Sequence, residues 1–406
     1  MMDAVLNEDI PCNLCGARNA SLLYPSTLGN TPLDAADFRC TSSAYGIHPP
    51  IVRCNICGLV YANPRWDSAL VNENYSVVQD PTYVEERQGR VLTFERNLAP
   101  LEQLIAPAST TRRLLDVGCH IGVMVELAQG RGWEAWGVEP SVWAAEQARA
   151  RGLRVLTGTL DTTTLPENYF DVVTMWDVIE HLTDPAAEVR RVHRVLAPGG
   201  IFAIHTIDIE SLFARLMGTR WPWLMEMHLY YFSPRTLSKL LAQNGFQVIQ
   251  FSAQGRYLRL GYLVTRLQPY NATVARWLTN IVTRLQWGGI RKTDGAEALR
   301  WTLEAREPLC HCRGCGQHEH GGRPGRGAGD CRATLAISLP LGVIAAYMLA
   351  QPRSRCRSRI RRRISRCTVT SKAVVGSSAT INLGASAKAI AIITRCRIPP
   401  DSWCGY

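Results

Sequence analysis

The sequence predicts an α/β fold built around a doubly wound parallel sheet, and three stretches support that prediction. The first, Arg113 to Ser141, reads as a strand, a glycine-bearing turn, a helix and a second strand. The second, Asn168 to Thr206, reads as a strand, a helix and a strand, and the third, Leu237 to Phe251, as a helix and a strand. Alternating strands and helices are typical of a sheet with helices on both faces.

Two acidic residues frame the first stretch. Asp116 ends the opening strand, and Glu139 follows the second strand, Glu134 to Val138, 23 positions further on. In a nucleotide-binding βαβ unit, backbone N–H groups of the turn face the ligand, and a carboxylate at the tip of the second strand reaches ribose hydroxyls. Gly118 and Gly122 permit a close backbone approach because neither carries a Cβ. A helix is expected from Val123 to Gln129.

The turn reads D-x-G-x-H-x-G, and this pattern separates two ligand classes. A dinucleotide fold has G-x-G-x-x-G. Here an acid precedes the first glycine by two residues, which would repel a pyrophosphate but can accept a hydrogen bond from an ammonium group. The segment resembles motif I of the class I S-adenosylmethionine (SAM)-dependent methyltransferases, [DE]-x-G-x-G-x-G. His120 replaces the middle glycine, and histidine tolerates positive φ better than most residues. An ordinary βα turn of another doubly wound domain is the alternative.

The second stretch strengthens the resemblance. It is similar to the family's FD-x-[VI]…EH-[LV]…L-[KR]-PGG block, with a strand from Phe170 to Met175, a helix from Ala187 to Leu196 that Pro-Gly-Gly ends, and a strand from Ile201 to Ile204. The resemblance covers roughly residues 111 to 255. It implies a Rossmann-like seven-stranded methyltransferase sheet, of which the last strands are not recognisable. The cofactor contacts that it implies are Asp116, Gly118, Cys119, His120, Gly122, Glu139, Pro140, Leu160, Trp176 and Asp177.

Two C-x-x-C-G knuckles precede this domain. Cys12 and Cys15 form one, and Cys54 and Cys57 form the other, with 38 residues between them. Four thiolates suit a tetrahedral structural zinc, and the glycine after each pair lets backbone amides turn toward the sulfurs. We expect a zinc-binding lobe in which the metal does no chemistry. The alternatives are reduced, non-ligating cysteines and a redox pair, but no thioredoxin-like unit surrounds either pair.

Helices are expected from Trp66 to Tyr75 and from Tyr83 to Ile105, where apolar residues recur at three and four positions. Beyond Thr206, aromatic residues crowd a segment of little periodicity. General base rates favour a core role for them, although the segment also resembles one that borders the substrate pocket in the family. The sequence after the second knuckle resembles the zinc-ribbon leader of bacterial methyltransferases, sugar C-methyltransferases among them.

Methyl transfer to a hydroxyl or a carbon acid needs a base. His181 follows Glu180 just past a strand end, and His228 lies close to Glu226 in the pocket-bordering segment. In the sugar C-methyltransferases that the chain partly resembles, histidines of these two blocks are implicated in deprotonating carbon next to a ketone. The resemblance therefore implies His181, His228 and Glu226 as catalytic residues. A structural role, in capping or packing, is the alternative for each histidine.

The last 120 residues differ from the rest. Residues 287–406 hold 20 Lys and Arg against 7 Asp and Glu, and 8 of the 14 cysteines. The basic charge therefore lies in the tail and gives no reason to expect nucleic-acid binding by the core. Cys310, Cys312, Cys315, His311, His318 and His320 have metal-ligating side chains, and the arginine-rich run suits an acidic polymer or an anionic membrane. Because these features do not agree with one another, we expect the tail to be disordered or the product of a frameshift.

The expected domains are a zinc-ribbon-like lobe at 1–65, a helical connector or lid at 66–110, the SAM-binding domain at 111–255, a helical segment at 256–286 and the tail at 287–406. Met1 to Ile10 shows no secretory leader, and the 17 apolar residues from Thr334 to Ala350 are short for a membrane span. A cytoplasmic protein is therefore expected. The sequence does not indicate an oligomeric state.

The expected function is SAM-dependent C- or O-methylation of a small molecule, most simply a nucleotide-linked sugar or glycan intermediate. The EH-L-x-D-P block also resembles enzymes that methylate a lipid or quinone-like acceptor. A non-catalytic SAM-binding remnant is the alternative from a different class. The expected cofactors are SAM and a structural Zn²⁺.

Overall fold

The computed structural model describes residues 6–29, 33–105, 111–268 and 271–287, and the short stretches 345–347, 375–376, 380–383 and 388–395. These residues belong to two compact units. The first holds the chain up to Arg256 together with strands β12 (Ala345–Tyr347) and β15 (Lys388–Arg395). The second starts at Tyr257. Its elements are most of β11 (Arg256–Arg259), α9 (Leu260–Thr265), α10 (Ala272–Trp287), β13 (Val375–Gly376) and β14 (Thr380–Leu383).

A parallel five-stranded sheet forms the centre of the first unit, which confirms the predicted fold class. Its spatial order is β6-β5-β4-β7-β8, and all four pairings are parallel. These strands are β4 (Arg113–Val117), β5 (Glu134–Glu139), β6 (Arg154–Thr157), β7 (Phe170–Trp176) and β8 (Leu196–Ile207). Because the chain reverses its direction of winding between β4 and β7, the ligand crevice is expected at the carboxyl ends of these two strands.

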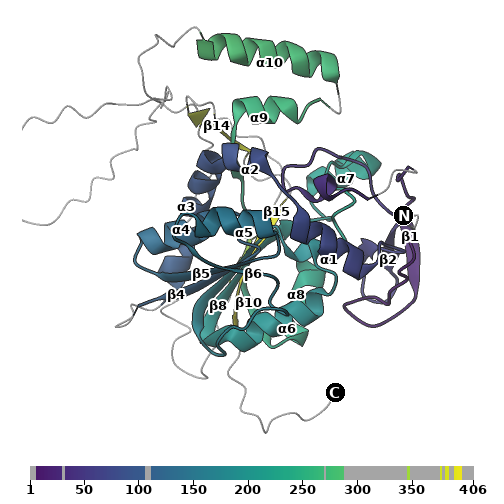
Figure 1. The fold of residues 1–406 in the computed structure, drawn as a ribbon. Helices are drawn as coiled ribbons and strands as arrows, with labels where there is room; N and C mark the ends of the chain where they lie inside the picture. The colour runs from purple at the N-terminus through teal and green to yellow at the C-terminus, as the bar shows by residue number, and fades with distance from the viewer. Residues whose placement is uncertain are drawn as a thin grey trace, which may run out of the picture. The chain divides into compact units, whose positions relative to one another are not determined.

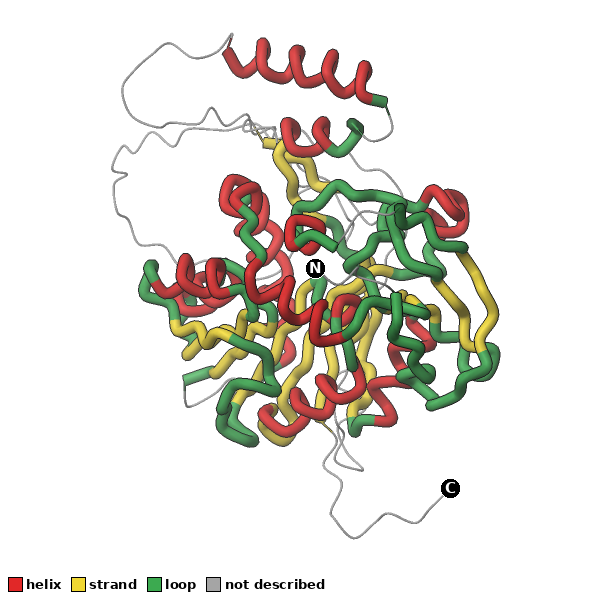
Figure 2. The backbone as a smooth tube through the Cα atoms, turned by 45° about the vertical axis from the view of Figure 1, so that its right-hand side comes forward, coloured by secondary structure: helices red, strands yellow, loops and turns green. Residues whose placement is uncertain are grey.

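Helices cover both faces of this sheet (Figures 1 and 2). Successive strand residues alternate between two apolar clusters: Leu114 packs with one helix layer and Leu115 with the other. The first layer contains α3 (Arg87–Leu104), α4 (Val123–Gly130) and α5 (Val142–Arg149), and the second contains α6 (Pro185–Val195) and α8 (Pro234–Gln243). The sheet is therefore buried on both sides, as parallel sheets are.

The N-terminal lobe is an antiparallel sheet of order β1-β2-β3-β9. Its first strands are β1 (Ala20–Tyr24), β2 (Ile51–Cys54) and β3 (Val60–Ala62), and a short 3-10 helix, η1 (Ala35–Phe38), lies between β1 and β2. The fourth strand, β9 (Tyr230–Tyr231), comes from far along the chain and pairs with β3. The lobe sheet is therefore completed by the segment that carries His228.

The connector forms three helices rather than two: α1 (Ser68–Val77), α2 (Pro81–Glu85) and α3. The single helix expected from Tyr83 to Ile105 is interrupted at Glu86. This residue is the N-cap of α3, and its backbone dihedral angles are not helical. The Asp80 carboxylate accepts a hydrogen bond from the amide of Tyr83 and so starts α2, with Pro81 at the first helical position. The short helix holds Tyr83 over the βα turn.

The aromatic segment after β8 fills a core. It contains α7 (Leu212–Met217) and a 3-10 turn, η3 (Gly218–Arg220), before β9. Trp221, Tyr230, Tyr231 and Phe232 are each at most 2% exposed. The core role is therefore confirmed for these four residues.

Three further strands extend the sheet beyond β8. β10 (Phe246–Ala253) is the expected last strand, and β15 pairs antiparallel with both β8 and β10. β12 also pairs with β10 and β15. Thus a strand of the tail takes part in the sheet. The tail's candidate ligands, from Cys310 to His320, lie outside the described residues.

We predict that ending the chain at Trp287 destabilises the sheet, because β8 and β10 would lose the partner that now lies between them. Amide hydrogen exchange should become faster in β8 and β10 than in the full-length protein, while β5 and β6 change little. Equal protection of β8 in both proteins would contradict this pairing and favour a non-native tail.

Among the helices of the described residues, none combines the length and apolar character needed to cross a membrane.

Candidate active site

The βα turn after β4 joins the tips of two strands. Gly118 has φ 69°, and its amide and that of Cys119 donate hydrogen bonds to the carbonyl of Val138, at 2.8 and 3.1 Å. The amide of His120 donates to Oε2 of Glu139 at 2.7 Å. The sequence predicts that amides of this turn face a ligand, but these three donate to β5 instead. They shape the turn, and a ligand would meet its side chains and the remaining donors.

Gly118 occupies a position that no side chain fits. A Cβ there would lie 2.5 Å from Cγ2 of Val178, and the positive φ adds strain for any other residue. We predict that Gly118→Ala destabilises the protein by about 1–3 kcal/mol and weakens SAM binding. Urea unfolding and calorimetry measure the two effects.

Gly130→Ala is the matched control for Gly118→Ala. Gly130 lies at the end of α4 in helical conformation, and a Cβ added there would have no atom within 4 Å, so alanine should be neutral or slightly stabilising. Equal behaviour of the two variants would show that the turn tolerates a Cβ.

Two buried carboxyl groups line the strand tips. Asp116 accepts a hydrogen bond from Oγ1 of Thr174 at 2.6 Å, and Glu139 accepts from the amides of His120 and Ser141 at 2.7 and 2.8 Å. Burial raises the pKa of Asp116 to about 7 and that of Glu139 to about 7, and the charge of Glu139 also acts on Asp116. A cation bound beside these two carboxyl groups would favour their ionised forms. The ammonium and sulfonium groups of SAM are cations of this kind.

We predict that SAM binding weakens as the pH falls through 7, by up to about tenfold per pH unit if one carboxyl group must lose a proton. The stability of the ligand-free protein should change in the opposite direction. Acids whose folded pKa is raised hold protons that the unfolded chain has released, so their contribution to stability decreases as pH rises from about 4 to 7. Calorimetric SAM titrations between about pH 6 and 8 measure the first trend, and urea unfolding between about pH 4 and 8 measures the second. In Asp116→Asn, SAM binding should be weaker at every pH and its pH dependence smaller.

His120 adopts φ 48°, as the sequence suggested that it can. Its ring stacks on Tyr83 with centroids 3.6 Å apart, and the guanidinium of Arg90 lies over the same tyrosine. Burial, followed by the charge of Arg90, lowers the pKa of His120 well below its usual value, so the imidazole is neutral. The residue that replaces the glycine thus contacts the connector helices.

The other residues implied as cofactor contacts lie nearby along the strand ends or pack behind the turn. Trp176 ends β7, and its Nε1 is buried with no hydrogen-bond partner among the described residues. Asp177, with φ 57°, is held by Nδ1 of His205 at 2.6 Å and by the Arg256 guanidinium. Pro140 follows β5. Leu160 is 5% exposed, and Cys119 and Gly122 pack against Gly137 and Leu153.

His181 and His228 form an imidazole pair. Their ring centroids are 4.8 Å apart, and ligand atoms of both rings lie within 4.8 Å of a Glu180 oxygen. Nδ1 of His181 contacts the carbonyl of Met227 at 2.9 Å, and Nδ1 of His228 contacts that of Trp223 at 2.7 Å. Because a carbonyl can only accept, both Nδ1 atoms carry the proton, and Nε2 is the basic nitrogen of each neutral ring.

Glu180, rather than Glu226, is the carboxylate beside these histidines. It is fully buried and accepts from Oγ1 of Thr206 at 2.8 Å. Glu226 accepts from Nε1 of Trp66 at 2.8 Å and thereby holds the segment onto the connector. In the sequence, Glu180 appears only as the residue before His181. The direction of its side chain depends on a 3-10 turn, η2 (Ile179–His181), which was not predicted.

Tyr75 was not predicted as a site residue. Its ring meets that of His181 edge-on at 6.0 Å, and its hydroxyl is buried without a hydrogen-bond partner among the described residues. Burial raises the pKa of Tyr75, and the charges of Cys40, Glu180 and Glu139 raise it further. The hydroxyl therefore lies within electrostatic reach of Glu139 at the strand tips and of Glu180, and the tyrosine ring contacts the imidazole pair.

The two knuckles of the lobe meet. Sγ atoms of Cys12 and Cys57 are 3.4 Å apart, those of Cys15 and Cys54 are 3.5 Å apart, and all four lie within 4.8 Å of one another. A tetrahedral zinc with bonds of about 2.3 Å separates its sulfurs by about 3.8 Å. Burial raises the pKa of Cys12 and of Cys57, whereas at Cys54 the effect of burial is outweighed by hydrogen bonds from the amides of Cys57 and Ile56 and from neighbouring thiols, which lower its pKa to about 7, so the fit to a metal depends on the sulfur distances. The cluster therefore fits a metal of the predicted type.

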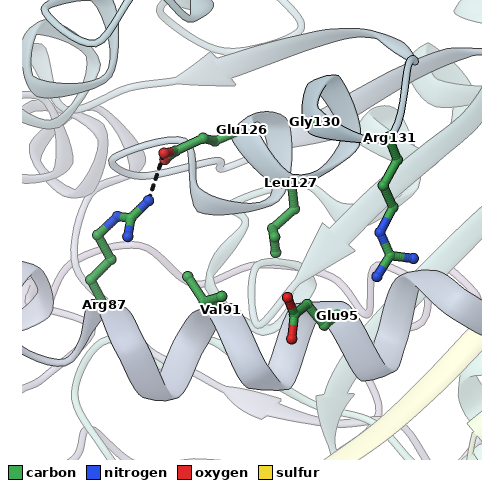
Figure 3. Close-up of a pocket in the computed structure, with 7 residues that line it drawn as sticks. All are labelled: Arg87, Val91, Glu95, Glu126, Leu127, Gly130 and Arg131. Carbon is green, nitrogen blue, oxygen red and sulfur yellow. Dashed lines mark hydrogen bonds and ion pairs between the residues drawn. The ribbon is translucent and has the colours of Figure 1, made fainter. Parts of the chain in front are cut away.

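A surface hollow of ≈390 Å³ lies elsewhere, between α3 and α4 (Figure 3). Arg87 reaches across it to Glu126 at 2.6 Å, and Glu95 points into it. None of the predicted site residues lines it. Since both partners of the ion pair are 37% exposed, the pair contributes at most about 1 kcal/mol. It links the connector to α4.

Residues 83–251 match a family described as a methyltransferase domain. Ubiquinone biosynthesis O-methyltransferases are similar to this chain. That of Bradyrhizobium sp. (strain ORS 278) is 33% identical over 31% of this chain and 49% of its own length. That of Methylococcus capsulatus is 33% identical over 29% of this chain and 54% of its own length. The chain thus spans about half the length of these curated relatives.

Among solved structures, a SAM-dependent methyltransferase of Thermotoga maritima, described as a possible histamine N-methyltransferase, is 26% identical. The match covers 42% of this chain and 76% of that one, with a TM-score of 0.34. That score is too low to support a comparison of sites.

The family match takes in α3, the parallel sheet and its strand-tip carboxylates. Residues 83–251 are therefore a class I SAM-dependent methyltransferase domain, joined to an N-terminal lobe with a four-cysteine cluster.

Proposed function

We propose that the chain transfers a methyl group from SAM to a nucleotide-linked sugar or glycan intermediate, on carbon or oxygen. The observation that carries the proposal is the imidazole pair, since it presents two oriented basic nitrogens beyond the carboxyl end of β7. Deprotonation of a hydroxyl, or of carbon next to a ketone, needs such a base. Zinc in the lobe would be structural.

The strand-tip residues fit SAM. Asp116 and Glu139 would hold its ammonium and ribose groups, and Gly118 keeps the turn close to the strand tips. When bound, SAM supplies an electrophilic methyl group. Nε2 of His181 or His228 would take the acceptor's proton, and the carbonyls of Met227 and Trp223 stabilise the imidazolium that forms. Tyr75 would donate its hydroxyl proton in a hydrogen bond to the acceptor.

A second candidate is O-methylation of a quinone-like phenol. The similarity to ubiquinone biosynthesis O-methyltransferases supports it. The same base would then remove a phenolic proton.

Calorimetric titration of SAM followed by an acceptor screen tests these proposals. Micromolar SAM binding is expected, and nucleotide-linked keto sugars should give methyl-labelled product with labelled SAM. Labelling of polyprenylated phenols alone would favour the second candidate. If folded, zinc-loaded protein fails to bind SAM, the chain is a remnant without methyltransferase activity.

A further inference from the structure

A second group of metal-ligating side chains lies beside the βα turn and takes no part in the proposed chemistry. Cys40 follows η1, Asp80 caps α2, and His120 comes from the turn itself. Their ligand atoms all lie within 4.8 Å of one another. Three segments that are far apart in the sequence therefore bring a thiol, a carboxylate and an imidazole together.

His120 indicates that this group is built to bind a ligand. Its Nδ1 is buried and has no hydrogen-bond partner among the described residues, although the residue is only 6% exposed. Stacking on Tyr83 fixes the ring, and the imidazole is neutral, so a lone pair is available. A buried unpaired nitrogen is unfavourable unless something coordinates it.

Asp80 is oriented by its own hydrogen bonds. Oδ1 accepts from Oγ1 of Thr41 at 2.5 Å and from the amide of Tyr83 at 3.1 Å, and Oδ2 accepts from the amide of Thr41 at 3.0 Å. A carboxylate offers about four lone pairs, so one remains for a cation. Hydrogen bonds of this kind orient carboxylates that bind metals.

The same three residue types could instead suggest a thiol nucleophile with its base, but the geometry disfavours it. Within the described part of the chain, no hydrogen bond joins Cys40 to His120, and Asp80 is bonded to Thr41 and Tyr83 rather than to the imidazole. A nucleophile needs both contacts.

We propose that Cys40, Asp80 and His120 bind a divalent cation of the zinc type, at a site distinct from the four-cysteine cluster. Thiolate, imidazole and carboxylate are all zinc ligands, and three protein ligands leave the fourth position to water. Zinc ligands lie about 3.3–3.8 Å apart, so the side chains must approach one another by up to about 1.5 Å. The Cys40 thiol loses its proton to solvent when the metal binds.

The surroundings give an ion a route to this site. Cys40 has accessible surface, and a polar hollow of ≈370 Å³ is lined by Arg39 and Thr41, the residues on either side of Cys40, and by Thr82, two residues after Asp80.

The metal is expected to oppose cofactor binding. The amide of His120 holds Glu139, so a metal on the His120 ring would fix the turn and place positive charge near the carboxyl groups that SAM needs. This competition rests on the proposed function, because it assumes that SAM binds here.

The test is titration of the full-length, lobe-zinc-loaded protein with Co²⁺, whose visible absorption reports thiolate coordination. The wild type should bind one more equivalent than Cys40→Ser and Asp80→Asn. Asp37→Asn, which removes a neighbouring acid outside the group, should match the wild type. The eight cysteines of residues 287–406 are common to all these proteins. Equal stoichiometry in the wild type and Cys40→Ser, with unchanged circular dichroism, would overturn the proposal.

A second arm measures SAM binding with added Zn²⁺. At about ten times its own Kd, zinc should raise the apparent Kd for SAM about tenfold in the wild type and not in Cys40→Ser. An unchanged Kd would overturn the competition. If no SAM binds at all, the proposed function fails, while the Co²⁺ stoichiometry still decides the metal site.

Discussion

Replacing His228 by asparagine is expected to lower kcat by about 10²–10⁴-fold and to leave the Kd for SAM within about twofold. The asparagine amide can still donate to the carbonyl of Trp223, as Nδ1 does at 2.7 Å in the wild type, but it offers no basic nitrogen. His181→Asn should act in the same direction, because its Nδ1 makes the equivalent contact with Met227. Initial rates of label transfer to the acceptor found in the screen measure the effect.

His193→Asn is the control for the two histidine variants. This histidine lies on α6 and packs edge-on against Phe246, away from the imidazole pair. It should keep its full rate. If His228→Asn and His181→Asn also kept theirs, the imidazole pair would be structural, as the alternative interpretation holds.

Replacing Cys57 by serine should abolish zinc binding in the lobe and destabilise it by more than about 4 kcal/mol, because structural zinc contributes much of the folding free energy of such small units. The loss should extend beyond the lobe. β3 pairs with β9, and the amide of Ala62 donates to the carbonyl of Leu229 at 2.9 Å, so an unfolded lobe releases the segment that carries His228. Zinc content, thermal unfolding and turnover measure this chain of effects.

Cys40→Ser is the control for the lobe, since it makes the same chemical change outside the four-cysteine cluster. It should retain the zinc equivalent of the lobe and, before further metal is added, the thermal transition, and it should lose only the second equivalent proposed at Cys40, Asp80 and His120. A Cys57→Ser protein that also retained both would show that the cluster is a set of reduced cysteines.

The features that could be predicted from the sequence are those that short sequence patterns determine. Hydrophobic runs between glycine turns predicted β4, β5 and β7 to within a residue or two, and C-x-x-C-G predicted which sulfurs would meet. Each depends on residues close together in the chain.

The features that were missed depend on long-range packing. Nothing local to Cys40 or Asp80 indicates that both approach His120, because η1, α2 and the βα turn are joined only by the tertiary fold. Tyr75 lies on α1 at ordinary helical spacing, and the position of Glu180 beside both histidines depends on the 3-10 turn η2, whose side-chain directions the sequence does not show. The strand β15 was not predicted, because its short apolar run lies in a tail whose composition differs from that of the rest of the chain.

The pairing of β3 with β9 has a consequence for engineering and for the ancestry of such proteins. A lobe whose last strand is supplied from between β8 and β10 of the main sheet cannot be trimmed away or exchanged between homologues at a single junction near residue 65. A chimera that kept the recipient's residues 230–231 would have to match the donor's edge strand in register. The lobe and the acceptor-side segment are therefore expected to be inherited as one piece, and recombination between them to yield inactive hybrids.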